Sequence, residues 1–464
     1  MKIYNTLTGR KEEFVPLIPN KVKIYACGVT VYDHCHIGHA RSAIVFDVIR
    51  RYMRYKGFDV KYVRNFTDID DKIINRAKQE GITWDAVAKK YTAEYYKDMD
   101  RLGVGRADVE PKATEHIEEI IGIIKGLIEK GYAYEVDSSV YFSVAKFPGY
   151  GKLSKRDMEE MTAGARVEVD ERKKNPLDFA LWKKSKEGEP SWESPWGLGR
   201  PGWHIECSVM IKKFLGEQID IHAGAQDLMF PHHENEIAQT EALAKKKPFV
   251  KYWLHGGLLM TGGQKMSKSL GNFITIEQVL EKWEPRVIRM FVASSRYQSK
   301  LDWSEKNLLQ AKKNLERMEE FVNKLKTQNA KRKTMTQKSR ISKLLKDSKT
   351  KFEEAMEDNF NTPEALAVLF EMIKAINPLF DKNEIDEKQA KEILEFLKDI
   401  DKIFNFIFPR KRETVPQKIK DLAKMREKCR TSKQWREADK IREQIERLGF
   451  ELKDAPTGPE IKKK

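Results

Sequence analysis

Residues 22–66 alternate between strand-like and helix-like patterns in an order that restricts the possible folds. The apolar run VKIYAC at 22–27 predicts a buried strand, and apolar residues between positions 44 and 52 then recur at helical spacing. A second apolar run, VKYVRNF at 60–66, predicts another strand. Strand, helix and strand in this order are typical of a parallel sheet with right-handed crossovers. We therefore expect an α/β fold.

The rest of the chain indicates an insertion and a helical C-terminal part. A chain of 464 residues is too long for one core, so we expect two to four domains. Residues 112–130 predict an amphipathic helix, and 133–144 predict a hairpin that turns at 137–139. Between 145 and 203 the pattern breaks up into Gly, Pro and charged residues, which suggests a segment that interrupts the sheet domain. Beyond about residue 304 almost everything has helical periodicity.

The C-terminal segment predicts two more helices, over 416–430 and 433–448. Thr431 and Gln434 have the spacing of a capping box for the second helix. The tail KDAPTGPEIKKK is expected to be frayed.

Charge and cysteine content narrow the class of protein. The net charge of +16 suggests a polyanionic partner such as nucleic acid, although a merely well-solvated lysine-rich surface gives the same balance. No apolar run approaches the roughly 20 residues of a membrane span, and the N-terminal residues lack a signal-peptide pattern. The four cysteines show no disulfide-framework spacing. We therefore expect a cytoplasmic location, no membrane association, and thiols that are free or bound to metal.

Two short segments have the composition of phosphate-binding elements. CHIGHAR places His36, Gly38 and His39 at the entry to a helix, where unpaired N–H groups and the helix dipole favour an anion. GGQKMSKSLGN places Lys265 and Lys268 on a loop that can close over a triphosphate. Each segment alone is weak evidence, because short His and Gly patterns and exposed lysine loops are common. In this order in an α/β chain, however, they resemble the HIGH and KMSKS signatures of class I aminoacyl-tRNA synthetases.

The cluster MFPHHENE at 229–236 suggests a metal site. Pro231 favours the first turn of a helix, so His232 and Glu236 lie one turn apart and can bind the same ion. His233 points about 100° round the helix and is expected to pack or to support these ligands.

Thiolates are the natural complement to this pair of ligands. The chain offers Cys27 at the end of the first strand and Cys207 in GWHIECSVM. Two sulfurs, one imidazole and one carboxylate suit zinc better than magnesium or calcium. Sequence spacing does not pair such distant ligands, and a lone cysteine is more often a small buried apolar residue.

Six segments resemble the cysteinyl-tRNA synthetases, a family of this class: YACGVTVYD, CHIGHAR, NFTDIDDKI, GRPGWHIECS, DLMFPHHENEIAQ and KMSKSLGN. The similarity extends from residue 1 to about 450. It implies a Rossmann-type parallel-sheet catalytic domain, split by an insertion and followed by α-helical C-terminal domains. The implied parts are a catalytic domain in two halves (1–118 and 200–258), an insertion or connective peptide (119–199), a stem-contact region with the KMSKS loop (259–312), a helical bundle (313–405) and an anticodon-binding domain (406–464).

The resemblance also implies an activity and its partners. The expected reaction is the ATP-dependent ligation of L-cysteine to tRNA(Cys) through a cysteinyl-adenylate, with Mg²⁺ accompanying ATP. The expected zinc ligands, for one Zn²⁺ per chain, are Cys27, Cys207, His232 and Glu236, the same four that ligand chemistry suggests. We expect a monomer.

Further roles follow from the same resemblance. His36, Gly38, His39 and Lys268 would bind ATP, and Lys265 and Lys268 would stabilise the reacting phosphorus. Asp227 would bind the ribose. The residues that would shape the cysteine pocket are Thr67, Trp203 and His222, and those that would contact the anticodon are Trp435 and Asp439. Both tryptophans have an alternative role as core residues.

The sequence departs from the family pattern at HAGAQDL, where Ala223 and Ala225 replace glycines near the expected adenosine site. Two other functions fit parts of the sequence. A ligase that transfers activated cysteine to a small amine would lack the region 406–448. An RNA-binding protein with a degenerate synthetase fold and a structural zinc would not need the HIGH and KMSKS residues.

Overall fold

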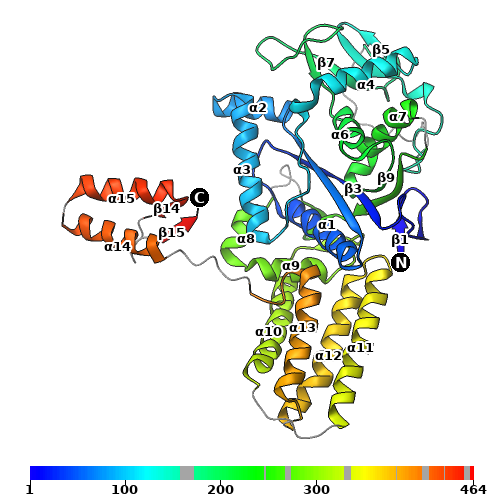
Figure 1. Ribbon diagram of the computed structural model, residues 1–464. Coiled ribbons are helices and arrows are strands. Elements are labelled where there is room, and N and C mark those ends of the chain that lie inside the picture. Colours follow the sequence, from blue (N-terminus) through cyan, green and yellow to red (C-terminus); the bar gives the residue numbers. More distant parts are fainter. Residues whose placement is uncertain are drawn as a thin grey trace. The chain divides into compact units, whose positions relative to one another are not determined.

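Four parallel strands form the central sheet, in the order β10-β9-β3-β4. Figure 1 labels two of them, β3 and β9. The strands are β3 (Lys21–Thr30), β4 (Asp59–Thr67), β9 (Ile219–Ala225) and β10 (Val250–Gly256). The two apolar runs of the N-terminal region lie in β3 and β4, and α1 (Ile37–Tyr55) joins them. The expected strand–helix–strand unit with a parallel sheet is therefore confirmed.

The strand order places a crevice beside the carboxyl end of β3. From β3 the chain passes through α1 to β4 on one side, whereas β9 and β10 add later on the other side of β3. Connections leave β3 and β9 in opposite directions, and ligands of open parallel sheets bind at such a point. Cys27 near the end of β3 and Ala225 at the end of β9 lie beside it.

Helices cover both faces of this sheet. Ile24 and Ala26 of β3 pack into the hydrophobic cluster that contains the buried residues of α1, whereas Tyr25 packs into the cluster that contains those of α6. Successive side chains of a strand point to opposite faces, so α1 and α6 lie on opposite sides of the sheet. The helices around the two faces are α2 (Asp71–Glu80), α3 (Trp84–Leu102), α6 (Ile205–Leu215), α7 (Glu234–Leu243), α8 (Ile276–Lys282) and α9 (Pro285–Ala293).

An antiparallel sheet interrupts the parallel one along the chain. Its strands, in the order β5-β6-β7-β8, are β5 (Ala133–Val136), β6 (Ser139–Phe142), β7 (Phe179–Lys184) and β8 (Gly199–Pro201). Asp137 and Ser138 form the turn of the first hairpin and both have positive φ, 47° and 59°, so the hairpin predicted at 133–144 is confirmed. The helix predicted over 112–130 is a short 3₁₀ turn, η1 (Ala113–His116), followed by α4 (Ile117–Glu129).

Short elements complete this part of the chain. They are β1 (Lys2–Asn5), β2 (Arg10–Glu13), η2 (Val144–Lys146), η3 (Gln226–Leu228), η4 (Met229–His233), β11 (Leu259–Thr261), β12 (Gln264–Lys265) and β13 (Leu301–Asp302). β1 pairs with β2, and β11 pairs with both β12 and β13.

A bundle of long helices follows, as the helical periodicity predicts. The helices are α10 (Glu305–Thr327), α11 (Thr336–Glu357), α12 (Thr362–Asp381) and α13 (Glu387–Phe404). Their apolar faces are continuous with the hydrophobic cluster of α1, through buried residues such as Phe352 and Phe404.

The chain divides into two compact units, Met1–Phe408 and Pro409–Lys464. The second contains α14 (Gln417–Thr431), α15 (Trp435–Arg447), β14 (Phe450–Lys453) and β15 (Glu460–Lys463). Its small core is formed by Ile419, Ala423, Ile445 and Leu452.

Two expectations for this C-terminal unit are wrong. Thr431 ends α14 and its hydroxyl donates to the carbonyl of Glu427 (2.8 Å), so it does not cap the next helix, which begins after Gln434. The tail is not frayed over residues 460–463, because β15 pairs antiparallel with β14, while residues 454–459 and 464 of the predicted frayed tail lie outside the described residues. Strand pairing satisfies the backbone groups that a frayed tail would leave to water.

The structure, a computed structural model, describes residues 1–156, 172–244, 247–266, 273–328, 336–382, 384–409, 417–432, 434–453 and 460–463. Among the helices in these ranges, none combines the length and the apolar composition needed to cross a bilayer.

Candidate active site and metal centre

A cavity of about 370 Å³ opens at the carboxyl ends of the parallel strands. Its walls come from the ends of β3, β4 and β9, from the first turns of α1, and from residues 256–259 after β10. The charged side chains among the described lining residues are mostly cationic. They are Arg41, Arg64 and Lys72, with Asp227 as the one carboxylate. The cavity therefore favours an anionic ligand.

The first turn of α1 brings two imidazoles to this cavity. His36 is the N-cap of α1, and its Nδ1 accepts a hydrogen bond from the backbone N–H of Gly38 (3.0 Å). His39 Nδ1 in turn accepts from the backbone N–H of His36 (3.2 Å), and the two rings stack with centroids 3.8 Å apart. A Cβ at position 38 would lie 2.7 Å from the His36 ring, so only glycine allows this ring position. The N-terminus of α1 and the two imidazoles therefore face the same part of the cavity, an arrangement that favours an anion.

Four side chains from distant parts of the sequence meet beside the same cavity: Cys27, Cys207, His232 and Glu236. Their candidate ligand atoms all lie within 4.8 Å of one another. The two Sγ atoms are 3.9 Å apart, Cys207 Sγ is 3.6 Å from His232 Nε2, and this nitrogen is 3.0 Å from Glu236 Oε1. Two sulfurs, one nitrogen and one carboxylate oxygen in such proximity are a donor set that fits zinc.

Local structure explains how His232 and Glu236 meet. The turn η4 passes directly into α7, and the two residues are separated by one helical turn. Their predicted position on one helical face is therefore confirmed by the 3.0 Å contact.

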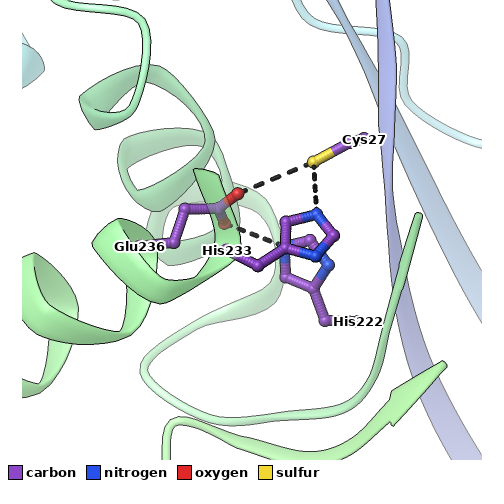
Figure 2. A group of neighbouring side chains, drawn as sticks. All are labelled: Cys27, His222, His233 and Glu236. Carbon is purple, nitrogen blue, oxygen red and sulfur yellow. Dashed lines mark hydrogen bonds and ion pairs between the residues drawn. The ribbon is translucent and has the colours of Figure 1, made fainter. Parts of the chain in front are cut away.

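His233 lies against the cluster, which agrees with its predicted packing or supporting position. Together with His222 it forms a second group that shares Cys27 and Glu236 with the first (Figure 2). His233 Nε2 is 3.3 Å from Cys27 Sγ, and His222 Nε2 is 2.8 Å from Glu236 Oε2. His222 is fully buried behind Glu236, so its contact with the cluster runs through that carboxylate.

The electrostatics of the cluster favour ionisation of two of its members, Cys207 and Glu236, whereas burial and the neighbouring Cys207 raise the pKa of the Cys27 thiol well above its usual range. The hydrogen bond with Cys27 lowers the pKa of the Cys207 thiol to about 6, against the effect of burial. Burial opposes the ionisation of Glu236, but the charges of His222 and His232 hold the pKa of this carboxyl well below its usual range. A thiolate and a carboxylate therefore face the same point, which suits a cation.

Several supporting residues have no signal in the sequence. His204 Nδ1 lies 2.9 Å from His232 Nδ1, so it fixes the ring whose other nitrogen faces the cluster. Glu234 accepts hydrogen bonds from the backbone N–H of Leu153 (3.1 Å) and of Ser154 (2.8 Å), which ties α7 to the inserted segment. These contacts join residues 28 to 81 positions apart, and no local pattern could identify them.

The expected pocket residues Thr67, Trp203 and Asp227 line the cavity. Trp203 is 38% exposed and stacks on His232 with centroids 4.5 Å apart, so it is not a core residue. Ala225 also lines the cavity, whereas Ala223 is fully buried in β9 opposite Leu254.

The remaining predicted residues are on β12, in the C-terminal unit, or outside the described residues. Lys265 belongs to β12, opposite Met260 of β11, and Lys268 lies outside the described residues. In the C-terminal unit, Trp435 is 57% exposed at the start of α15, and Asp439 is exposed one turn further on. Trp435 is therefore not the core anchor of its helix.

Two protein families match the sequence. Residues 13–313 match the family described as tRNA synthetases class I (C) catalytic domain, and residues 351–408 match the DALR domain.

Curated relatives match the whole chain. The cysteine–tRNA ligase of Thermodesulfovibrio yellowstonii is 51% identical over 481 residues, which cover 98% of each chain. The cysteine–tRNA ligase of Carboxydothermus hydrogenoformans is 52% identical over 464 residues, which cover 99% of each chain.

Solved structures of other synthetases share the fold. A Mycobacterium tuberculosis methionyl-tRNA synthetase in complex with methionyl-adenylate has a TM-score of 0.60 at 13% identity, covering 84% of this chain and 88% of its own. The Agrobacterium radiobacter K84 AgnB2 LeuRS, in a ternary complex with tRNA and LeuAMS, has a TM-score of 0.62 at 11% identity, with 85% of each chain covered. At these identities the likeness concerns the fold alone.

Proposed function

This chain belongs to the cysteine–tRNA ligases, and on that premise we propose that it recognises its amino acid through a zinc ion held by Cys27, Cys207, His232 and Glu236. The family activity is the ATP-dependent ligation of L-cysteine to tRNA. The carboxylate of cysteine attacks the α-phosphorus of ATP, and pyrophosphate leaves to give cysteinyl-adenylate. A ribose hydroxyl of the terminal tRNA adenosine then attacks the activated carbonyl, and AMP leaves.

In the first step the protein positions the reactants and neutralises charge, with Mg²⁺ accompanying ATP. His36 and His39 contact the ATP phosphates at the start of α1, and Gly38 lets the phosphates approach the backbone there. Lys265 and Lys268 stabilise the charge on the reacting phosphorus as pyrophosphate leaves. Support comes from the stacked histidines at a helix N-terminus and from the cationic lining of the cavity.

The amino-acid end of the cavity must separate cysteine from serine. The two amino acids differ by one atom, and packing alone discriminates between such similar substrates by a free-energy difference of only about 1–3 kcal/mol. Zinc bound by these side chains supplies a soft Lewis acid that prefers a thiolate to a hydroxyl, which stays protonated. Trp203 and Thr67 form the walls of the cysteine pocket, and His222 contributes to it by holding Glu236. Asp227 binds the ribose of ATP.

The tRNA is bound by the C-terminal parts. Residues 406–464 form the anticodon-binding domain, in which Trp435 stacks on a base and Asp439 accepts a hydrogen bond from a base edge. The exposure of both side chains on one face of α15 supports this assignment. The other domain boundaries are those that the resemblance implies, with the inserted segment 119–199 dividing the catalytic domain into two halves. We also propose that the enzyme acts on tRNA(Cys) as a monomer in the cytoplasm.

One observation carries the zinc proposal. The thiols of Cys27 and Cys207, 180 positions apart in sequence, approach within 3.9 Å beside an imidazole and a carboxylate at the wall of the cavity.

Metal analysis combined with pyrophosphate exchange tests the proposal. The wild-type enzyme should contain about one zinc per chain and should exchange labelled pyrophosphate into ATP with cysteine but not with serine. Cys207→Ala should lose the zinc, and its preference for cysteine over serine should fall to the roughly 10–200-fold that packing provides. Cys429→Ala, in the other unit, is the matched control and should retain both properties.

Other outcomes point to other functions. Rejection of serine by a zinc-free wild-type enzyme, or by Cys207→Ala, would contradict the zinc proposal. Cysteine-dependent exchange without charging of tRNA would indicate a small-amine ligase. No exchange at all would indicate an RNA-binding protein with a structural zinc.

A further inference from the structure

We propose that Glu206 is a positioning residue that orients the substrate cysteine. Its carboxyl accepts the hydrogen bond that the hydroxyl of Thr67 donates, so that this hydroxyl can only accept hydrogen bonds from a ligand in the cavity. Thr67 Oγ1 donates to Glu206 Oε2 at 3.1 Å. Thr67 lines the cavity, whereas Glu206 lies behind it and is 1% exposed. The inference rests on the proposed function, because it takes Thr67 to be part of the cysteine pocket.

The position of Glu206 follows from two neighbouring elements. Thr67 is the last residue of β4, and Glu206 lies in the first turn of α6, which packs on that strand. Cys207 follows Glu206 directly, so the carboxyl lies next to the metal cluster in sequence. The pair Thr67–Glu206 therefore borders the part of the cavity where the sulfur of cysteine is recognised.

Apart from Thr67, no residue that the structure describes pairs with this carboxyl. Glu206 Oε1 is buried and has no hydrogen-bond partner among the residues that the structure describes. No Lys or Arg in those ranges lies within ion-pair distance of it, in contrast to Asp47 and Glu241, which are also buried. Buried polar atoms in native proteins are normally paired, so an unpaired one calls for an explanation, and a role in the neighbouring site is one.

The chemistry of a hydroxyl links this contact to the substrate. A threonine hydroxyl has one hydrogen and two lone pairs. When the hydrogen is donated to Glu206, the oxygen can only accept from the cavity side. An ammonium group is a donor without lone pairs, whereas a carboxylate only accepts.

This donor–acceptor pattern gives the cysteine a direction. The hydroxyl of Thr67 accepts from the ammonium group of cysteine and excludes its carboxylate. With the sulfur directed to the metal cluster and the ammonium group to Thr67, the carboxylate is left to face the cationic lining of the cavity, where ATP binds.

The test is a double-mutant cycle read by cysteine-dependent pyrophosphate exchange. Thr67→Val and Glu206→Met should each raise the KM for cysteine by about 10- to 100-fold, the range for a hydrogen bond to a charged group. The double variant should be no worse than either single variant, because both changes remove the same contact. Glu206→Gln should stay within about threefold of wild type, because an amide oxygen can accept the same hydrogen bond. The KM for ATP should change less than about twofold throughout.

Several controls separate positioning from a general structural effect. Glu241→Gln replaces another buried carboxylate, on α7 and outside the cavity lining, and should leave the KM for cysteine unchanged. Multiplicative effects in the double variant, a parallel rise in the KM for ATP, or a Glu206→Gln enzyme as impaired as Thr67→Val would overturn the proposal. If Glu206→Met does not fold, the comparison of Glu206→Gln with Thr67→Val still decides it.

The result is distinguishable from a failure of the proposed function. A wild-type enzyme without zinc or without cysteine-dependent exchange would contradict that function. An unchanged KM for cysteine in Thr67→Val would remove Thr67 from the pocket and overturn this inference, while leaving the zinc assignment intact. A Glu206→Met enzyme that folds and keeps the wild-type KM for cysteine, beside an impaired Thr67→Val, would overturn the inference alone.

Discussion

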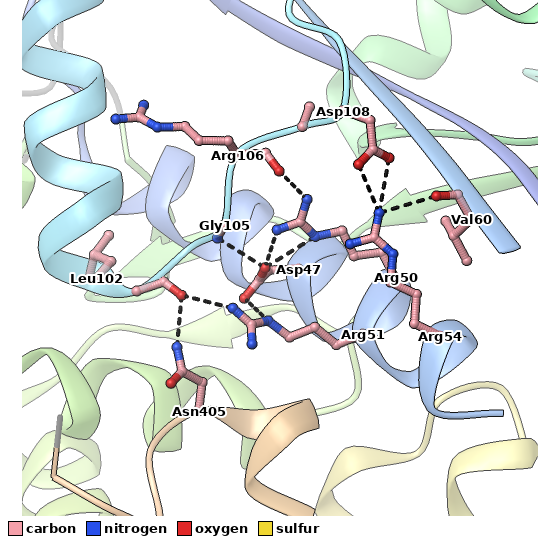
Figure 3. Close-up of polar contacts among 12 residues, drawn as sticks. Asp47, Arg50, Arg51, Arg54, Val60, Leu102, Gly105, Arg106, Asp108 and Asn405 are labelled. Carbon is pink, nitrogen blue, oxygen red and sulfur yellow. Dashed lines mark hydrogen bonds and ion pairs between the residues drawn. The ribbon is translucent and has the colours of Figure 1, made fainter. Parts of the chain in front are cut away.

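Arg289 of α9 and Asp47 of α1 form a buried ion pair, with Nη2 of the arginine 2.9 Å from Oδ2 of the aspartate. Asp47 also accepts hydrogen bonds from Arg50, from Arg51 and from the backbone N–H of Gly105 (Figure 3). Burial alone would raise the pKa of Asp47, but the charges of the three arginines outweigh it and lower that pKa.

The pair connects α1 to the bundle. Arg289 Nε donates to the carbonyl of Phe404 at the end of α13 (2.7 Å). Asp47 lies on the helix whose first turn presents His36 and His39 to the cavity. One carboxylate therefore fixes α1 against both α9 and the last helix of the bundle.

Asp47→Asn should destabilise the unit Met1–Phe408 by about 3–5 kcal/mol, because it leaves buried guanidinium groups without their counter-charge. Urea unfolding followed by circular dichroism measures the loss. Lys391→Ala breaks an exposed pair with Glu387 on α13 and serves as the control, with an expected change below about 0.5 kcal/mol. Equal losses in the two variants would contradict the role assigned to Asp47.

Gly38→Ala should lower the rate of pyrophosphate exchange by about 100-fold, because a Cβ 2.7 Å from the His36 ring must displace that ring. Gly122→Ala in α4 is the control, since nothing lies within 4 Å of its Cβ. The control should keep full activity and gain about 0.5–1 kcal/mol of stability. An active Gly38→Ala enzyme would show that the ring position does not matter for adenylate formation.

Stability should depend on pH through Asp98 of α3. Burial raises the pKa of this carboxyl to about 7, and Glu277 and Glu94 add to the effect against Arg101 and Lys97. A carboxyl whose pKa is raised on folding contributes stability that is fully present below about pH 4 and is lost as the pH rises through 7. Asp98→Asn removes this loss. The free energy of unfolding of the variant, relative to that of the wild type, should therefore be about 2 kcal/mol higher at pH 8 than at pH 5.

Urea unfolding of the wild type and of Asp98→Asn at pH 5 and pH 8 measures this difference. A variant whose stability relative to wild type is the same at both pH values would show that Asp98 does not titrate in this range.

Trp435→Ala should raise the KM for tRNA by about tenfold, since stacking on a base contributes roughly 1–3 kcal/mol. The melting temperature should not change, because the side chain is 57% exposed, and pyrophosphate exchange should stay at the wild-type rate. Leu448→Ala, an exposed apolar residue after the same helix, provides the comparison in aminoacylation assays. A loss of exchange activity in Trp435→Ala would argue against an anticodon role.

Local patterns in the sequence are sufficient for some features of the site. The helical spacing of His232 and Glu236 predicts their contact, because residues one turn apart meet on any α-helix. The apolar runs of β3 and β4 with α1 between them predict the parallel pairing, because crossover connections follow general rules of handedness and adjacency.

Other features depend on contacts that local patterns do not encode. The angle round the helix predicts that His233 packs against or supports the ligands, but it does not identify Cys27 as the ligand that His233 contacts, at 3.3 Å. The capping box predicted at Thr431 fails because the hydroxyl finds a carbonyl in its own helix.

The sequence by itself determined the order of strands and helices, the segments whose composition predicts phosphate binding, and which side chains are chemically able to bind a soft cation. The tertiary structure alone decided that Cys27 meets Cys207, that Thr67 donates to Glu206, and that Asp47 pairs with Arg289. Periodicity and capping act over a few residues of chain, whereas these contacts join positions 139 to 242 residues apart, and only the packing of helices on both faces of the sheet brings them together.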